Sequence, residues 1–229
     1  MEYRNELKFE LSDFDLIRIR NRLFSLMHTD RHQGSDGYLI RSLYFDDLYN
    51  SCTDEKENGV LHREKYRIRQ YGNNPDFIRL EKKTRQGDMS RKTMQPLSLP
   101  DYETLLSGDL NRLHILLSQS KGGLLDELIL KIIRKRFSPK CIVEYERFAF
   151  TETMGNVRIT FDRNIAGSTQ TDRLFDSDLF TVPVMPQSHH ILEIKYDELL
   201  PHYILQALDL GNLRRQSFSK YYMTRAAIG

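Results

Sequence analysis

Charged and apolar residues alternate along several short stretches of the chain. In residues 3–11 the even positions carry charge, at Arg4, Glu6, Lys8 and Glu10, while the odd positions are mostly apolar. Side chains on a β-strand point alternately to its two faces, so this stretch predicts a strand with one charged and one apolar face.

The same alternation recurs further along the chain. In residues 157–162 and 191–196 the positions between the charges are strongly apolar, as at Ile159 and Ile194. Two more β-prone stretches occupy residues 39–45 and 141–150. The charged positions of the later strands are Lys65, Arg67 and Arg69; Arg79, Glu81 and Lys83; Arg158 and Asp162; and Glu193 and Lys195.

Helical patterns separate the predicted strands. Ser12 followed by Asp15 is typical of a helix start with a capping box, and Phe14, Ile17 and Leu23 are among the apolar positions that follow. Residues 102–117 and 124–133 have amphipathic spacing, which predicts helices that pack against a sheet. The fold class expected from these elements is α+β.

The grouping of charges on the strands allows two interpretations. A single strand with one charged face usually exposes that face to water. Here several strands each carry basic residues at alternate positions, and like charges side by side destabilise a sheet. If the sheet closes into a barrel, the charged faces form a polar lumen, and a bound polyanion relieves the repulsion within it.

Composition limits the remaining possibilities. The 229 residues carry a formal net charge of only +2, so no global basic field indicates a nucleic-acid partner. Cys52 and Cys141 lie far apart and predict reduced thiols in a cytoplasmic protein. We see no signal peptide and no apolar stretch long enough to span a membrane. A single domain over residues 1–229 is the simplest expectation.

Nine short motifs occur in one order along nearly the whole chain. They are ELKFEL, SLYFD, HREKYRIRQYG, RLEKKT, SRKT, YERFAF, VRITFD, ILEIK and FSKYY. In this series the sequence resembles the catalytic domain of the vacuolar transporter chaperone (VTC) family. That family is a polyphosphate polymerase branch of the triphosphate tunnel metalloenzymes, which are related to the CYTH domain.

The resemblance implies a closed antiparallel eight-stranded β-barrel, a tunnel, with helices packed outside. It implies that Glu193 binds a divalent metal, Mn²⁺ or Mg²⁺, and that Lys195 lines the same tunnel and belongs to the catalytic set. It also implies a set of phosphate contacts, of which all but Lys92 and Ser219 are counted as catalytic: Lys8, Arg67, Arg69, Lys83, Lys92, Arg158, Ser219 and Lys220.

Four positions carry an alternative or a departure. The related hydrolases begin with Glu-x-Glu-x-Lys, whereas Arg4 stands here at the first acid, which weakens a two-metal hydrolase interpretation. Glu81 is either a second metal ligand or, as we favour, an ion-pair partner of Arg79 and Lys83. Glu193 could instead pair with Lys195, and Lys220 could simply follow an N-capping serine.

The function expected from the residues and the resemblance together is transfer of the γ-phosphoryl group of ATP to a growing polyphosphate. A metal-dependent triphosphatase and a non-enzymatic polyphosphate- or nucleic-acid-binding module are the alternatives. ATP and polyphosphate are the expected ligands, and nucleic acid is not expected. The sequence is not expected to span a membrane itself. Because the domain is paired with membrane segments in the family it resembles, a separate membrane protein is a possible partner.

Overall fold

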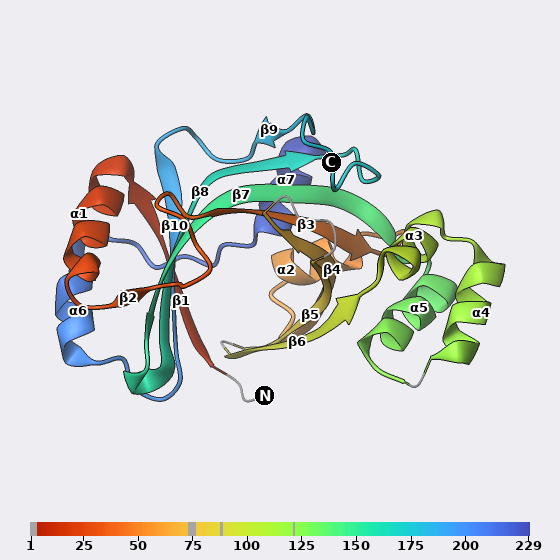
Figure 1. Ribbon diagram of the computed structural model, residues 1–229, viewed down its shortest axis with the longest axis horizontal. Helices are drawn as coiled ribbons and strands as arrows, with labels where there is room; N and C mark the ends of the chain where they lie inside the picture. The colour runs from red at the N-terminus through yellow and green to blue at the C-terminus, as the bar shows by residue number, and fades with distance from the viewer. Residues whose placement is uncertain (1–3, 73–76, 88, 121) are drawn as a thin grey trace.

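The computed structural model describes residues 4–72, 77–87, 89–120 and 122–229, and its main feature is one antiparallel sheet. Eight strands follow the order β1-β10-β8-β7-β3-β4-β5-β6, while β2 pairs with β7 and β9 with β8 (Figure 1). Tyr3, predicted to begin the first strand, lies outside the described residues. The strands are β1 (Asn5–Ser12), β2 (His28–Thr29), β3 (Tyr38–Asp46), β4 (His62–Tyr71), β5 (Ile78–Gln86), β6 (Met89–Leu97), β7 (Ser138–Glu152), β8 (Val157–Ser168), β9 (Val182–Pro183) and β10 (His189–Tyr196).

The sheet curls until its two edge strands, β1 and β6, approach each other. They meet at one isolated bridge between Arg4 and Ser90, and no continuous ladder joins them in the described residues. Further along β1 the C-terminal segment takes the place of a neighbour, since the Gln216 amide donates to the Lys8 carbonyl. The large antiparallel sheet is therefore as predicted, but its closure into a barrel is not confirmed.

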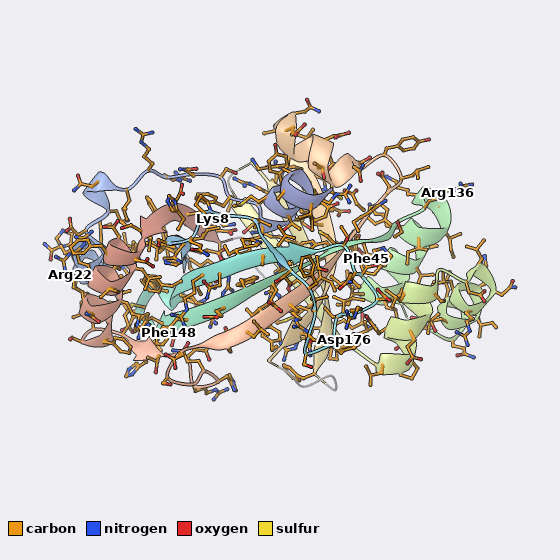
Figure 2. All side chains as sticks on the ribbon, turned by 90° about the horizontal axis from the view of Figure 1, so that it is seen from above. Lys8, Arg22, Phe45, Arg136, Phe148 and Asp176 are labelled. Carbon is orange, nitrogen blue, oxygen red and sulfur yellow. The ribbon has the colours of Figure 1, made fainter. Side chains whose placement is uncertain are left out.

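Helices cover both flanks of the sheet. Figure 2 shows Arg22 of α1 and Arg136, just beyond α5, at opposite ends of the molecule. Among the described helices, none has the length and apolar character needed to cross a membrane. The helices are α1 (Asp13–Phe24), α2 (Ser51–Glu57), α3 (Leu99–Ser107), α4 (Leu110–Gln119), α5 (Leu124–Lys135), α6 (His202–Leu208) and α7 (Lys220–Ile228).

The helix predicted after Ser12 begins as expected, because the Ser12 hydroxyl accepts a hydrogen bond from the Asp15 amide. Its buried face differs from the prediction. Leu16, Ile19 and Leu23 are buried, whereas Phe14 is 74% exposed and Ile17 is 57% exposed. This helix carries two apolar stripes, and only one of them faces the sheet.

The apolar strand faces pack into two clusters. One lies under α1 and α6 and contains Ile159, Phe161 and Ile194, as their alternation predicted. The other lies under α5, where Leu128 packs with Ile68 and other residues of β4 and β5. Because the apolar faces are used in these clusters, the charged faces are left to surround the space inside the curl of the sheet.

The last helix, α7, packs very closely on β8. A Cβ atom at Gly167 would lie 2.4 Å from Thr224 Cγ2, so only glycine permits this approach. The N-terminal turn of α7 then reaches the interior of the sheet, where Ser219, Lys220 and Tyr221 help to line a cavity. The expectation that the helices lie outside the sheet therefore holds for α1 and α5 but not for the start of α7.

Candidate functional site: a cation-lined cavity

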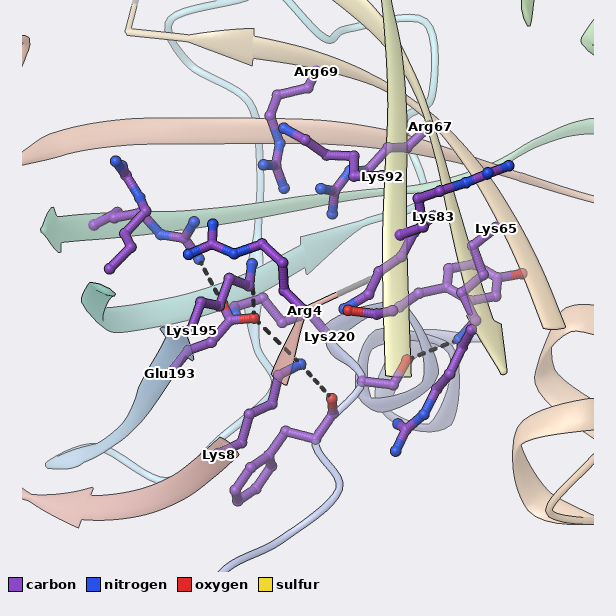
Figure 3. Close-up of a pocket in the computed structure, with 18 of the residues that line it drawn as sticks. Arg4, Lys8, Lys65, Arg67, Arg69, Lys83, Lys92, Glu193, Lys195 and Lys220 are labelled. Atoms are coloured by element: carbon purple, nitrogen blue, oxygen red, sulfur yellow. Dashed lines mark hydrogen bonds and ion pairs between the residues drawn. The ribbon is translucent and has the colours of Figure 1, made fainter. Parts of the chain in front are cut away.

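The charged strand faces surround one cavity of about 970 Å³ (Figure 3). The period-two alternation accounts for this, because side chains two residues apart on each strand point to the same side. The roles of these residues stay predictions. All ten predicted site residues line the cavity: Lys8, Arg67, Arg69, Lys83, Lys92, Arg158, Glu193, Lys195, Ser219 and Lys220.

Positive charge dominates the cavity wall. Sixteen lysines and arginines are among the described residues that line it, against three carboxylates, Asp30, Glu193 and Asp197. Three further acids, Glu6, Glu81 and Asp162, contact the lining cations and do not balance them. Because the whole chain has a net charge of only +2, the cavity concentrates positive charge that the rest of the molecule compensates. Such a wall favours a polyanionic ligand.

Like charges stand directly opposite one another on neighbouring strands. Lys65 of β4 faces Lys83 of β5, and Lys83 in turn faces Lys92 of β6. Arg69 faces Arg79 in the same way. Opposed like charges destabilise a sheet, so their grouping needs compensation from acids or from a ligand.

Glu81 provides part of that compensation. Its carboxylate is 1% exposed and lies 2.6 Å from Arg67, 3.1 Å from Lys92 and 3.6 Å from Arg69. Burial alone would raise the pKa of Glu81, but these three cations, Arg69 foremost, hold it well below its usual range. Glu81 is thus an ion-pair partner, as we favoured, although the predicted partners Arg79 and Lys83 are wrong.

Other polar groups fix the direction of the two arginines. Arg67 donates to the Tyr44 hydroxyl at 2.8 Å, and Arg69 donates to the Ser42 hydroxyl at 3.2 Å and the Tyr145 hydroxyl at 3.1 Å. With Glu81 on one side and hydroxyls on the other, both guanidinium groups have little freedom. A planar guanidinium held in this way matches the oxygens of a phosphate.

A second acidic group lies at the seam between β1 and β6. Glu6 of β1 accepts hydrogen bonds from Lys83 at 2.7 Å and from the Ser90 hydroxyl at 2.8 Å. Burial would raise the pKa of Glu6, but Lys8 and Lys83 outweigh it and lower the pKa to about 2. Glu6 is therefore ionised at neutral pH and links the two edge strands.

Glu193 of β10 faces Lys8 across the ladder between β1 and β10. Its carboxylate lies 3.1 Å from Lys195, 3.4 Å from Arg147 and 3.9 Å from Lys8. Burial acts to raise the pKa of Glu193, but Lys195 and Lys8 lead the groups that keep it well below its usual range. The pairing of Glu193 with Lys195, the alternative to metal binding, is present, and it leaves the metal assignment open.

A divalent metal fits the oxygens of Glu6 and Glu193. The Lys8 ammonium lies 3.2 Å from Glu6 and 3.9 Å from Glu193, so one cation already stands between the two carboxylates. The described residues contain no group of three or more His, Cys, Asp or Glu side chains that could hold a metal. Mg²⁺ and Mn²⁺ prefer oxygen ligands, and Mg²⁺ is often held by one or two carboxylates with phosphate oxygens and water completing its coordination.

A third acid, Asp162 of β8, holds the start of α7. Arg147 of β7 contacts both Asp162 oxygens, at 2.6 and 2.7 Å, and Lys220 donates to Asp162 at 2.5 Å. Lys220 also lies 4.7 Å above the Tyr145 ring. Ser219 caps the helix by accepting from the backbone of its first turn, as the alternative interpretation expected, and its phosphate contact stays a prediction. Lys220 is therefore fixed at the cavity wall by a buried acid and a ring.

Arg158 marks a different part of the wall. Its guanidinium donates to Asp30 at 2.7 Å and to the Tyr38 hydroxyl at 3.2 Å. Tyr38 lies 6.3 Å from Tyr71, and Tyr71 lies 6.1 Å from Phe77, measured between ring centroids. These three aromatic rings line the cavity beside Arg158.

Sequence reasoning missed the acids that position the cations. Glu6 and Asp162 shared the charged faces of their strands, so their alternation could have placed them with the site. Arg147 lies on a strand whose pattern gave no such signal, and Asp30 lies in a loop. The pairing of β7 with β8 places Arg147 opposite Asp162, and the pairing of β8 with β10 brings Glu193 near both.

A curled antiparallel sheet around a cation-lined cavity defines an α+β protein with a cavity whose charge suits a polyanionic ligand. The VTC domain profile matches residues 3–228, and the chain belongs to the VTC domain family. The family predicted from the nine motifs is thereby confirmed.

Solved structures with a similar course of the chain come from distant sequences. The PH1819 protein of Pyrococcus horikoshii is 14% identical, with a TM-score of 0.48 over 98% of this chain and 98% of that chain. A “putative adenylate cyclase” of Vibrio parahaemolyticus is 11% identical, with a TM-score of 0.49 over 97% of this chain and 98% of that chain. No curated protein matches the sequence significantly.

Proposed function

We propose that this protein is a polyphosphate polymerase that transfers the γ-phosphoryl group of ATP to a growing polyphosphate chain. The observation that carries the proposal is the cavity itself, in which lysines and arginines from β1, β4, β5, β6, β8, β10 and α7 face one another with few carboxylates between them. Membership of the VTC domain family supports the same ligand class.

In this proposal the protein contributes position and charge. Arg67 and Arg69 hold the oxygens of the triphosphate, because Glu81 and the surrounding hydroxyls keep their guanidinium planes fixed. Lysine ammonium groups bind phosphate as compact charges without the fixed plane of a guanidinium, which allows the chain to move forward after each addition. Phosphoryl transfer depends mainly on such positioning and on neutralising charge, and no covalent nucleophile is required. The lysines assigned to this role are Lys8, Lys83, Lys92, Lys195 and Lys220.

Glu193, with Glu6 beside it, would hold a divalent metal. When bound, the metal would neutralise negative charge on the phosphate oxygens during transfer. Lys8 and Lys83 keep the Glu6 carboxylate ionised, and Lys195 and Lys8 keep the Glu193 carboxylate ionised.

The proposal also treats the curled sheet as a tunnel. The seam between β1 and β6 is spanned by side chains, because Glu6 binds Lys83 and Ser90 of the opposite edge. A chain held in a tunnel with a spanned seam would enter and leave through its ends, which supports repeated additions without release.

One observation favours a second candidate, a metal-dependent triphosphatase. Glu6 lies beside Glu193 and adds a second carboxylate to the metal position, and more carboxylates suit activation of a water molecule. The same cavity would then bind a triphosphate for hydrolysis.

Incubation with ATP and Mn²⁺, followed by a gel that resolves long polyphosphate from orthophosphate, separates the candidates. A ladder of long chains supports the polymerase. Orthophosphate without chains would favour the triphosphatase. ATP that stays intact would favour a binding module without enzymatic activity.

A further inference from the structure

On the side of α2 and α7, the cavity wall carries cations that, among the described residues, are not paired with carboxylates in the way the predicted site residues are. Lys56 of α2, with Arg63 and Lys65 of β4, line the cavity there. Arg63 stands opposite Arg85 of β5, so the row of opposed like charges continues past Lys65 and Lys83. Lys65 donates to the Ser219 hydroxyl at 2.9 Å, as the dashed line in Figure 3 shows, which joins this stretch to the start of α7.

These three cations differ from the predicted site in their partners. Every lysine and arginine of the predicted site has a carboxylate within 4.0 Å. In the described part of the chain no carboxylate forms an ion pair with Lys56, Arg63 or Lys65. Lys65 lies over the Tyr221 ring at 5.2 Å and Lys56 over the Tyr222 ring at 5.9 Å. Within the described residues, acids act on this group only without direct ion pairs, Asp46 on Lys65 and Glu55 on Arg63.

The repulsion among these groups is reflected in their acidity. Burial lowers the pKa of Lys65 to about 8, with Arg63 and Lys8 acting in the same direction. Burial, Arg63 and Arg85 lower the pKa of Lys56, and burial and Arg85 lower that of Arg63. A negatively charged ligand would relieve this repulsion, whereas water alone leaves it in place.

Distance along β4 separates the far end of this stretch, Arg63, from the arginines assigned to the triphosphate, and Lys65 lies between them. Arg63 is four residues from Arg67, which at roughly 3.4 Å per residue is about 14 Å along the strand. One phosphate group cannot reach both positions. A ligand that contacts both must therefore be several phosphate units long.

We propose that Lys56, Arg63 and Lys65 form a second phosphate-binding stretch, which holds inorganic polyphosphate beyond the triphosphate bound by the acid-paired cations. The assignment rests on the proposed polyphosphate function. It names the growing chain as the ligand of this side of the cavity, and it gives the stretch the role of retaining long chains in preference to short ones.

The test compares two probes on the whole chain, polyphosphate of about one hundred units and tripolyphosphate, by calorimetric titration without ATP. In the double variant Lys56→Ala/Arg63→Ala, the affinity for the long probe should fall about tenfold more than the affinity for tripolyphosphate. Binding of the long probe should also depend less on salt concentration. The matched control is Arg134→Ala/Lys135→Ala, which removes two charges from exposed positions outside the cavity.

An equal loss for both probes would overturn the proposal, because these residues would then belong to the triphosphate site. An unchanged ratio, or an equal fall in the control variant, would overturn it as well. A parent protein that binds neither probe would refute the stretch and the polyphosphate function together. A parent that shows the length-dependent binding but makes no polymer from ATP would refute the polymerase and keep the stretch.

Discussion

At the scale of residues, the predicted phosphate-binding cations are held in place by acids. Glu81 holds Arg67, Arg69 and Lys92, and Glu6 holds Lys83. Such pairing reduces the repulsion in the empty cavity and fixes the geometry of the donors before a ligand arrives. A polyanion therefore meets an ordered wall, at the cost of competing with the acids for the same donors.

The first prediction concerns Glu193. Replacing it by Gln keeps the shape and removes the charge, so phosphoryl transfer should fall by about a hundredfold or more. Polyphosphate binding should persist or strengthen, because Lys8 and Lys195 lose a counter-ion. Initial rates with Mn²⁺ and binding isotherms measure the two effects. Glu146→Gln, which removes a half-exposed acid paired with Arg163, is the control. Full activity in Glu193→Gln, or activity that survives chelation of the metal, would overturn the metal assignment.

The second prediction is a pH dependence at Lys65. Its pKa of about 8 in the free protein should rise when a polyanion binds, so binding above pH 8 takes up a proton. Lys83, whose pKa burial lowers to about 7, titrates in the same range, so affinity for long polyphosphate should begin to fall above pH 7 and fall by up to about a hundredfold per unit above pH 8. Titrations at several pH values measure this. The groups that face Lys65 are Lys83, Arg63, Lys8, Asp46, Cys52, Ser219 and Tyr221.

Lys65→Arg is the informative control, because a guanidinium stays charged across this range. The fall above pH 8 should become shallower in that variant, at most about tenfold per unit, because Lys83 alone still titrates. The same steep fall with arginine in place would assign the titration to another group.

At the scale of elements, the sequence predicted which residues share a strand face, because that depends on alternation alone. It placed Lys65, Arg67 and Arg69 together on β4, and the structure agrees. It could not predict which strands become neighbours, so the partners of Glu81 were wrong. It also could not choose between the two apolar stripes of α1, because that choice depends on how the helix docks.

The third prediction uses the pairing of β4 and β5. Arg67→Ala/Arg69→Ala should lower polyphosphate affinity and should also destabilise the fold by about 3–5 kcal/mol, because Glu81 would stay buried with Lys92 as its remaining described ion-pair partner. Chemical denaturation and binding titrations measure the two effects separately.

Adding Glu81→Gln to the double variant separates the two roles of the arginines. It removes the buried carboxylate charge that the arginines no longer balance, so much of the stability should return while binding stays weak. A triple variant that binds polyphosphate as tightly as the parent would show that the arginines are structural.

At the scale of the whole molecule, the proposed polymerase would have to move a long chain through a sheet whose edge strands no continuous ladder joins in the described residues. The antiparallel strands and their inward charges could be predicted from the motifs and their alternation. The seam could not, because it depends on the Arg4–Ser90 bridge and on the C-terminal segment that lies along β1, contacts between residues far apart in the sequence. Lengthwise movement and sideways escape through the seam remain distinct physical possibilities.

The last prediction tests that choice by locking the seam. Arg4 and Ser90 form an antiparallel bridge, whose Cα separation of about 4.5–5.5 Å suits a disulfide. Oxidised Arg4→Cys/Ser90→Cys should be about 4–5 kcal/mol more stable than its reduced form, as expected for so large a closed loop. Cys52 and Cys141 are buried and should not interfere. The reduced form is the control, since it has lost the same Arg4 contacts to Asp197 and Asn156. If chains move lengthwise, the oxidised protein should extend polyphosphate to the same length as the reduced one. If oxidation stops synthesis and reduction restores it, the seam must open during each cycle, and the closed-tunnel account of repeated addition is wrong.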